Sequence, residues 1–438
     1  MQQTTHNSND NTPSIPRGTR VVIFGGCGYV GLKIAEELFK EIGYSVLLAD
    51  IMPPPQASQW DYALCDITNS EALEALFVNE EKKFFTGGQN KGIIELVIHL
   101  ASAGMSGKGM LDPATETINV KGTQNIIEAC VRHDVKALVY ASSYNVVFGG
   151  QEIFLGESAT TPYFPYHLHT DFYSRSKRIA EEMVLAANCA NHSSLMTTSL
   201  RPAAIYGEGE SRHFPRIVAH MDNGLFMFRI GRATVDWVHG DNLAQAFRKA
   251  LVNLHLQHLN PSAASKFPSA AGKAYAISDG TPIDSFEFLR PVCEARKIPY
   301  PSLVLPLWVA IKAAYIFERI FLLMRFLIGS KWVPAPFLTR AEVYKVAVTH
   351  TLSIREAQRD FGYQPTLTTS EGAQRMGHFY ALKEGEFTNA MKLAVTFEIL
   401  ILAIQIIIAV FLICFSLSNF SNAYLFFLKI LQLRVAQN

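Results

Sequence analysis

The hydrophobic positions in the first third of the chain are grouped into short, continuous runs separated by amphipathic stretches. The run at 21–24 is short, continuous and β-branched, as expected of a strand buried on both sides of a sheet, and further strands are predicted at 45–49, 60–64, 93–100 and 137–141. Between them, the spacing of apolar residues predicts helices over residues 32–41, 70–78 and 117–133. Strands that alternate with helices predict an α/β fold built on a doubly wound parallel sheet.

The polar stretches suggest where domains begin and end. Residues 1–18 are rich in Asn, Thr, Ser and Pro and lack the apolar core of a signal peptide, so we predict a disordered leader there. Residues 19–205 would form the sheet domain, and residues 206–385 a smaller C-terminal substrate lobe of mixed helices and strands. A polar stretch at 80–92, with two adjacent glycines, predicts a surface insertion.

Two long apolar segments near the carboxyl end have different charge patterns. Residues 303–328 carry charges along one narrow stripe, at Lys312, Glu318, Arg319 and Arg325. Burying them at a bilayer centre would cost about 2.5–3.5 kcal/mol each, so we predict a helix in the membrane interface, with a buried core helix as the alternative. Residues 399–417 are uncharged and would extend about 28 Å as a helix, which predicts a transmembrane helix at 396–418 and a short tail at 419–438.

The composition narrows the class of protein. Of the 438 residues, 49% are hydrophobic and 18% are charged, which is typical of a globular protein with an apolar bias. A formal net charge of +1, without a basic patch interleaved with aromatic residues, argues against a nucleic-acid partner. The six cysteines lack C-x-x-C or metal-ligand spacing, which predicts reduced thiols facing the cytosol and no metal site.

The turn after the first predicted strand contains Gly25, Gly28 and Gly31. That spacing leaves room for a tight turn, for close approach of a pyrophosphate to backbone amides, and for tight packing of the next helix. The positive N-terminal end of that helix suits phosphate binding. Asp50 ends the second strand about 20 residues later, where a carboxylate accepts hydrogen bonds from ribose hydroxyls and repels a 2′-phosphate. These features predict NAD as the cofactor, because a glycine turn that binds nothing would leave Asp50 unexplained.

Tyr173 and Lys177 lie one turn apart on a predicted helix, so both side chains leave the same face. An ammonium beside the phenol would lower the pKa of the tyrosine from about 10 toward neutrality, so that Tyr173 could exchange protons at working pH. The spacing is frequent by chance, and an ordinary surface helix is the alternative. Ser142 and Ser143 favour the chemical interpretation, because they follow a strand whose carboxyl end faces the ligand crevice, although a serine there can also cap a turn.

Two further polar residues have alternative interpretations. Asp66 follows the strand at 60–64 and could lie near an adenine edge, or could cap the helix that follows. His99 ends another strand, ahead of small residues that suit a cofactor-lining loop. Because no second ligand stands at metal spacing, we interpret His99 as a packed, hydrogen-bonded histidine.

These motifs resemble the extended short-chain dehydrogenases/reductases, and within them the 3β-hydroxysteroid dehydrogenase/isomerase group. The resemblance rests on Gly25, Gly28, Gly31, Asp50, Asp66-Ile67, His99-Leu100-Ala101, Asn119-Val120-Lys121-Gly122-Thr123, Ser142-Ser143, Tyr173 to Lys177, Leu200-Arg201-Pro202, Tyr206-Gly207, Val238-His239, Asp241-Asn242, Thr349-His350, Phe361-Gly362-Tyr363 and Pro365. In this order the motifs span most of residues 20–365. The stretch 142–150 is similar to the 42E branch of the superfamily.

The resemblance implies roles for individual residues. Tyr173 would be the catalytic acid/base, and Lys177 would hold the nicotinamide ribose and lower the tyrosine pKa. Ser143 would polarise the reacting oxygen, with Ser142 as the alternative because the stretch that follows is slightly longer than in the steroid enzymes. Asn119 would order the active-site helix or a proton relay. The cofactor-binding residues would be Gly25, Gly28, Tyr29, Val30, Gly31, Asp50, Asp66, Ile67, Ala101 and Lys177.

The expected function is that of a membrane-anchored, NAD-dependent oxidoreductase acting on the CH–OH group of a steroid or sterol, a lipid-like substrate that suits an apolar second lobe. Two alternatives are a nucleotide-sugar epimerase or dehydratase of the extended family, and a non-catalytic NAD-binding regulatory protein. We expect a single-pass protein whose catalytic domain is cytosolic, in the endoplasmic reticulum membrane. The oligomeric state stays open, although the paired long helices of this scaffold favour a homodimer.

Overall fold

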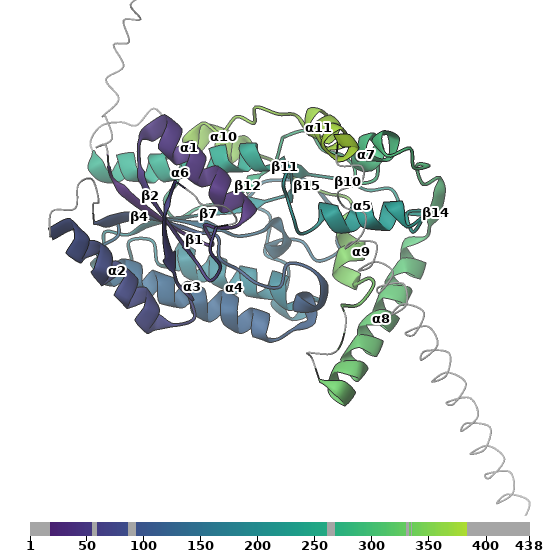
Figure 1. Cartoon of the computed structure of the whole chain (residues 1–438), viewed down its shortest axis with the longest axis horizontal. Coiled ribbons are helices and arrows are strands. Elements are labelled where there is room, and N and C mark those ends of the chain that lie inside the picture. The colour runs from purple at the N-terminus through teal and green to yellow at the C-terminus, as the bar shows by residue number, and fades with distance from the viewer. Residues whose placement is uncertain are drawn as a thin grey trace, which may run out of the picture.

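A seven-stranded parallel sheet forms the centre of the larger domain (Figure 1). The computed structural model describes residues 18–54, 59–85, 93–260, 268–329, 333 and 335–382. The strands of this sheet are β1 (Arg20–Phe24), β2 (Ser45–Asp50), β3 (Asp61–Leu64), β4 (Ile94–His99), β5 (Ala137–Ala141), β7 (Met196–Pro202) and β12 (Ala274–Ile277). Their order is β12-β7-β5-β4-β1-β2-β3, and every pairing in the sheet is parallel. The predicted Rossmann-type sheet is therefore confirmed.

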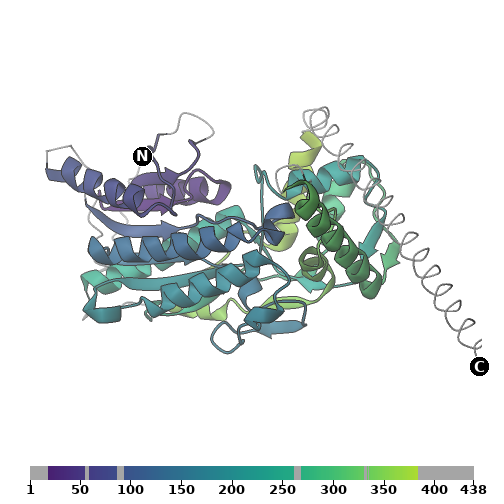
Figure 2. The same cartoon turned by 90° about the horizontal axis from the view of Figure 1, so that it is seen from below.

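Helices cover both faces of the sheet (Figures 1 and 2). One face carries α1 (Tyr29–Ile42), α6 (Gly240–Leu259) and α10 (Arg355–Phe361), and the other carries α2 (Ser70–Phe85), α3 (Ala114–Arg132) and α4 (Phe172–Ala186). Alternate residues of β1 enter different cores, with Val21 and Ile23 in one and Val22 and Phe24 in the other. Burial on both sides explains why this strand is a continuous apolar run in the sequence.

The smaller lobe combines short strands with short helices. Its largest sheet has the order β13 (Ile283–Asp284), β10 (Thr234–Val235), β15 (His350–Leu352) and β6 (Ile153–Gly156). Two further pairs join β11 (Trp237–His239) with β8 (Ala204–Tyr206), and β14 (Leu303–Leu305) with β9 (Phe228–Ile230). The helices are α5 (Phe214–Asp222), α7 (Arg290–Ala295), α8 (Leu307–Ile328), α9 (Arg340–Ala347) and α11 (Thr369–Leu382). The lobe has its own core, in which Tyr206 and Phe214 pack on Phe288.

The predicted boundary at residue 205 does not separate the two parts. Both α6 and β12 come after it, yet both belong to the larger domain. α6 packs on α1, where Arg248 Nε donates to Glu37 Oε2 (3.1 Å), and β12 pairs with β7 at the edge of the sheet. The local pattern of α6 and β12 could not reveal this, because a strand can join a sheet edge from any later point in the chain.

The prediction of a surface insertion at 80–92 is wrong for its first residues, 80–85. α2 continues to Phe85, and Glu80 is buried with 3% of its surface exposed. Its Oε2 accepts hydrogen bonds from Arg20 Nη2 (2.7 Å) and Nε (3.0 Å), and Arg20 is itself buried at the start of β1. Glu80 is therefore held in the domain by an ion pair with a distant strand. Residues 86–92 lie outside the described part of the chain.

α8 lies at the end of the molecule away from the seven-stranded sheet (Figure 2). One face packs on α9 through Ala310 and Ala314, and the buried Glu318 pairs with Arg340 at 2.7 Å. The opposite face is open, and Phe326 is 84% exposed. The helix predicted at 303–328 begins only at Leu307, because Leu303–Leu305 form the strand β14, and Glu318 belongs to the packed side and not to a solvated stripe.

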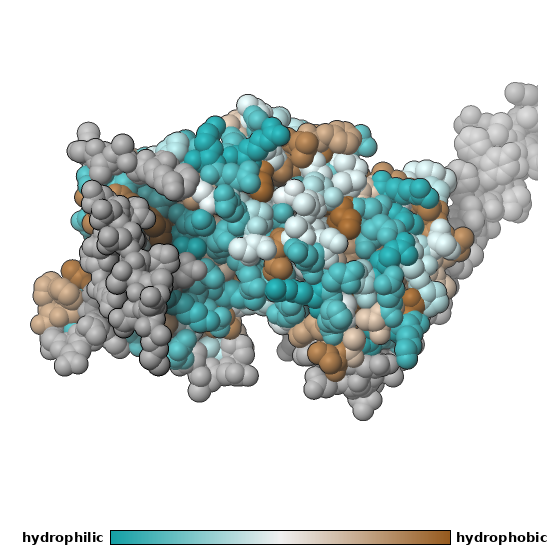
Figure 3. Space-filling view, turned by 90° about the horizontal axis from the view of Figure 1, so that it is seen from above, coloured by the Kyte–Doolittle hydropathy of each residue, from teal (hydrophilic) through white to brown (hydrophobic). Residues whose placement is uncertain are grey.

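The predicted membrane-spanning helix concerns another part of the chain. Among the described residues, no helix is both long and apolar enough to span a bilayer. The predicted transmembrane helix at 396–418 and the tail at 419–438 lie outside the described residues, as does the leader up to residue 17. On the face seen from above, hydrophilic residues predominate and hydrophobic ones form small, separate patches (Figure 3). The membrane anchor therefore stays a prediction from sequence.

Candidate active site

The glycine turn between β1 and α1 leaves backbone amides open. Gly25 has a φ of +79°, and a Cβ there would lie 2.7 Å from the Ala101 amide nitrogen. A Cβ on Gly31 would lie 2.5 Å from Gly26 O, so helix and turn are in tight contact. At Gly28 the nearest atom to a Cβ would be 3.4 Å away, and no side chain caps α1. The first amides of α1 are therefore free to bind a phosphate.

Asp50 ends β2 beside this turn. Its Oδ2 accepts from the Cys27 amide (3.1 Å), and its Oδ1 accepts from the Met52 amide (3.2 Å). The carboxylate is only half-buried, so its remaining lone pairs can accept from a ligand hydroxyl. The open amides and this acceptor fit the pyrophosphate and adenosine ribose of NAD.

Asp66 and Ile67 lie at the carboxyl end of β3. Asp66 is exposed, and its Oδ1 accepts from the Thr68 amide and hydroxyl, both at 2.8 Å. It therefore caps the turn ahead of α2, which was one of its two interpretations. Ile67 is buried and packs on Gly122 of α3.

Three further predicted cofactor residues line the glycine turn. The Ala101 amide donates to Phe24 O (2.9 Å), which brings its loop against the turn. Val30 packs partly against the core of the sheet domain. The Tyr29 hydroxyl donates to Tyr206 O (3.4 Å), so the first residue of α1 contacts the smaller lobe.

Tyr173 lies in the first turn of α4 and is 4% exposed. Asp171 caps this helix by accepting from the Ser174 amide (2.7 Å). A hydrogen bond with Ser143 lowers the pKa of the phenol, but burial has the larger effect and raises that pKa above its usual value. The predicted lowering of the Tyr173 pKa toward neutrality is therefore not found, because burial in apolar surroundings disfavours the phenolate.

Lys177 is buried one turn further along α4. Its ammonium donates to Ala141 O (2.6 Å) and Tyr140 OH (3.2 Å), and Nζ lies 6.0 Å from the centroid of the Tyr173 ring. Burial lowers the pKa of Lys177 to about 7, against the opposing effect of the Glu181 carboxylate. The structure thus brings Tyr173 and Lys177 together at the carboxyl edge of β5, with the ammonium held by that strand.

The two serines after β5 face different neighbours. Ser143 contacts Tyr173 and also accepts from the Asn145 amide (3.3 Å). Ser142 lies by the Glu181 carboxylate and helps to stabilise its negative charge. Of the two serines, Ser143 is therefore the neighbour of Tyr173.

Asn119 joins the loop after β4 to the helix that carries Tyr173. Its Nδ2 donates to Ser176 Oγ (2.8 Å) and to Ala103 O (3.1 Å), and its Oδ1 accepts from the Ala103 amide (2.8 Å). The side chain is buried. These contacts tie α4 to the loop after β4, which is compatible with the first of the two implied roles, ordering of the active-site helix.

His99 is a packed histidine in the described chain. Thr123 Oγ1 donates its hydrogen to Asn119 O (2.6 Å). His99 Nε2 must therefore be the donor in its hydrogen bond of 2.9 Å with Thr123 Oγ1. Burial lowers the pKa of His99 well below its usual value, which keeps the ring neutral. Within the described residues, no group of His, Cys, Asp and Glu side chains is arranged to hold a metal ion.

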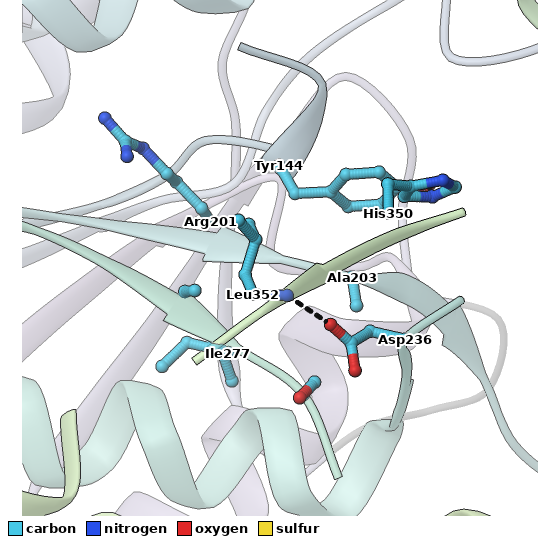
Figure 4. Close-up of a pocket in the computed structure, with 9 residues that line it drawn as sticks. Tyr144, Arg201, Ala203, Asp236, Ile277, His350 and Leu352 are labelled. Carbon is cyan, nitrogen blue, oxygen red and sulfur yellow. Dashed lines mark hydrogen bonds between the residues drawn. The ribbon is translucent and has the colours of Figure 1, made fainter. Parts of the chain in front are cut away.

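The smaller lobe contributes groups that no sequence motif assigned to a role. Lys345 of α9 places Nζ 6.0 Å from the centroid of the Tyr173 ring, and Arg212, ahead of α5, lowers the pKa of the same phenol. His350 of β15 stacks on Tyr144, with ring centroids 4.9 Å apart (Figure 4). His350 belonged to the carboxyl-terminal pattern. Lys345 and Arg212 gave no signal, because only the packing of the lobes brings them to Tyr173.

A small cavity lies between Tyr144 and Asp236, against β15 (Figure 4). Asp236 Oδ2 accepts from the Leu352 amide (2.7 Å), and burial raises the pKa of this carboxyl to about 7. The enclosed space suits about one water molecule, so it is too small to hold a substrate.

Solved structures share the fold. They include an epimerase from Methanothermobacter thermautotrophicus, with a TM-score of 0.61 and 17% identity over 85% of this chain and 95% of that chain. A UDP-glucose 4-epimerase from Thermus thermophilus in complex with NAD has a TM-score of 0.57 and 21% identity, over 83% of this chain and 99% of that chain. At these identities the likeness shows the fold alone.

Sequence relatives define the family. The short-chain dehydrogenase/reductase family 42E member 1 of Danio rerio is 41% identical over 370 residues, or 82% of this chain and 88% of the relative. A 3 beta-hydroxysteroid dehydrogenase/Delta 5-->4-isomerase of Mycobacterium tuberculosis (strain ATCC 25618 / H37Rv) is 31% identical over 82% of this chain and 90% of its own. The 3-beta hydroxysteroid dehydrogenase/isomerase profile matches residues 22–307. The chain therefore belongs to the 3-beta hydroxysteroid dehydrogenase/isomerase family, within the extended short-chain dehydrogenases/reductases.

Proposed function

We propose that the chain is a membrane-anchored, NAD-dependent oxidoreductase that acts on the CH–OH group of a steroid or sterol. The observation that carries the proposal is the contact between Tyr173 and Ser143 at the carboxyl end of β5. Oxidation of an alcohol needs a group that moves a proton and a donor that holds the oxygen, and Tyr173 and Ser143 are neighbours here. The relative from Mycobacterium tuberculosis, which is named for this chemistry, supports the steroid class.

In the oxidative direction, Tyr173 in its phenolate form takes the proton of the substrate hydroxyl. Ser143 donates a hydrogen bond to the same oxygen as the O–H bond breaks. NAD, when bound, supplies the hydride acceptor, so that the alcohol carbon loses its hydride and becomes a ketone carbon. Because burial raises the pKa of Tyr173, positive charge beside the ring is needed to stabilise the phenolate at working pH.

The choice of NAD rests on Asp50 and on the open turn at Gly28. The half-buried carboxylate of Asp50 accepts hydrogen bonds from ribose hydroxyls and repels a 2′-phosphate. The uncapped amides at the start of α1 bind the pyrophosphate. We therefore expect tighter binding of NAD than of NADP.

Two features support a substrate that arrives from lipid. The open face of α8 carries Trp308, 63% exposed, and Phe326, 84% exposed. The sequence contains an uncharged apolar segment at 399–417, long enough for a bilayer. We propose a single-pass anchor at 396–418, with the catalytic part on the cytosolic side of the endoplasmic reticulum. Digestion of intact microsomes by an added protease tests this, and a protected catalytic part would contradict it.

The activity can be tested with the purified full chain, NAD and a panel of 3β-hydroxysteroids. We expect NAD reduction by the wild type and a loss of at least about a hundredfold for Tyr173→Phe, because general acid–base catalysis contributes about that much. Tyr166→Phe, at an exposed tyrosine ahead of the same helix, is the matched control and should keep the wild-type rate.

Three other outcomes would contradict the proposal. Equal rates for wild type and Tyr173→Phe would rule out the mechanism. Turnover of UDP-glucose without steroid oxidation would favour the nucleotide-sugar alternative. Calorimetric binding of NAD with no oxidation of any steroid in the panel would favour a non-catalytic, NAD-binding protein.

A further inference from the structure

The ring of Tyr173 has two lysines at the same distance. Lys177 Nζ and Lys345 Nζ each lie 6.0 Å from its centroid. Lys177 is one turn further along α4, in the larger domain, whereas Lys345 belongs to α9 of the smaller lobe. An ammonium at this distance from an aromatic ring is at the limit of a favourable cation–π contact. The position of Lys345 thus depends on how the smaller lobe packs over the larger domain.

The carboxylates near Lys345 have other partners. Glu342 accepts from the Thr339 amide and hydroxyl, both at 2.9 Å, and so completes the cap of α9. Glu210 accepts from three backbone amides at the start of α5 (Arg212, His213 and Phe214). Among the described residues, no carboxylate forms an ion pair with Lys345. Its charge is therefore available to the tyrosine.

Lys177 alone supplies limited positive charge. Burial lowers its pKa to about 7, which weakens the positive charge that it supplies near neutral pH. That ammonium is also committed to Ala141 O at 2.6 Å. Stabilising a buried phenolate therefore calls for a further cation.

We propose that Lys345 is this second cation, supplied by the smaller lobe, and that it stabilises the phenolate form of Tyr173. A positive charge attracts an ionised phenol more strongly than a neutral one, so it favours loss of the proton. Replacing Lys345 by an uncharged residue should make Tyr173 harder to ionise. The consequence for turnover rests on the proposed function, in which Tyr173 moves the proton, but the effect on ionisation does not.

Other groups also act on this phenol. They include Asp171, which caps α4, Lys177 of α4, Tyr140 of β5, Ser143 and Tyr144 after that strand, and Arg212 ahead of α5. Arg212 is exposed, and its charge is therefore screened by solvent. Lys345 is half-buried and lies over the ring itself.

The test uses the full chain with difluorotyrosine placed at position 173, followed by fluorine NMR through a pH titration. The fluorine atoms make the phenol more acidic and report its ionisation at this one residue. We expect Lys345→Met to raise the midpoint of the titration by about one pH unit. Lys345→Arg keeps the charge and should leave the midpoint within a few tenths of a unit. Lys312→Met, at an exposed lysine that lies over Trp308 on α8, should not move it.

The results separate this inference from the proposed function. A midpoint that is unchanged in Lys345→Met overturns the inference. So does a change confined to the KM for a carboxylated steroid, which would assign Lys345 to substrate binding. If no steroid is oxidised while the midpoint still rises, the proposed function fails and the inference stands. If steroids are oxidised, the pKa that defines the acidic limb of the kcat/KM profile should be higher in Lys345→Met, by the same amount as the NMR midpoint.

Discussion

The Tyr144 hydroxyl lies 3.0 Å from His350 Nε2, and this contact joins the carboxyl edge of β5 to β15 of the smaller lobe. His350 Nδ1 is 2.6 Å from Val348 O, which can only accept, so Nδ1 carries the proton and Nε2 accepts from Tyr144. The imidazole also stacks on Phe148, with ring centroids 4.0 Å apart. The smaller lobe therefore holds the residue that directly follows Ser143.

Removing either partner of this pair should destabilise the protein. His350→Phe leaves the buried Tyr144 hydroxyl unpaired, and Tyr144→Phe leaves the imidazole acceptor unpaired, at a cost of about 1–3 kcal/mol each. The double variant should lose less stability than the two single variants lose together, because neither group is then left unpaired. Urea unfolding of the four proteins measures this. His378→Phe, at an exposed histidine, should change the free energy of unfolding by less than about 0.5 kcal/mol, and additive costs in the pair would contradict the prediction.

Stability should fall in acid partly because of His350. Burial lowers its pKa to about 4 from the ordinary value of 6.5, so between these two pH values the unfolded chain binds a proton that the folded chain excludes. The folded state therefore loses stability as the pH drops through this window, by about 2–3 kcal/mol near pH 4.5. Unfolding of the wild type and of His350→Gln at pH 7 and pH 4.5 gives the difference. Equal acid sensitivity of the two proteins would contradict this assignment.

The ion pair between Arg201 and Glu181 should be strongly coupled. Both side chains are buried, and Arg201 Nη2 donates to Glu181 Oε1 at 2.6 Å. Arg201→Met leaves a buried carboxylate without its partner, so we expect a loss of about 3–5 kcal/mol. Adding Glu181→Leu to this variant should restore part of the lost stability.

An exposed ion pair serves as the matched control for this buried one. Lys40 Nζ lies 3.8 Å from Glu36 Oε2, and these side chains are 68% and 55% exposed. Lys40→Met should therefore cost no more than about 1 kcal/mol. Chemical denaturation of both variants measures the contrast, and a small loss in Arg201→Met would show that the carboxylate finds another partner or is protonated.

Two glycines of the cofactor turn should respond differently to alanine. Gly28 has ordinary backbone angles and room for a Cβ, so Gly28→Ala should fold with an unchanged Tm. The added methyl group lies in front of the amides of α1, and NAD affinity should fall at least about tenfold. Gly25→Ala should instead lower the Tm, because its φ is +79° and its Cβ would meet the Ala101 backbone. Thermal melts and calorimetry with NAD test both, and unchanged affinity in Gly28→Ala would contradict this cofactor site.

The sheet domain was predictable from the sequence because its signals are local. A strand buried on both faces, such as β1, must be apolar at every position. A turn with the φ of Gly25 needs a glycine. The separation of Tyr173 and Lys177 follows from the pitch of one helix, so their common face was determined before any tertiary contact was known.

Tertiary structure alone decided the features that depend on distant residues. β12 joins the sheet from beyond the predicted boundary, and Glu80 is buried because it meets Arg20. Lys345 reaches the ring of Tyr173 only through the packing of the two lobes. Burial of Tyr173 reversed the predicted direction of its pKa, since the spacing of two residues along a helix indicates which charges are neighbours but not how much water is excluded.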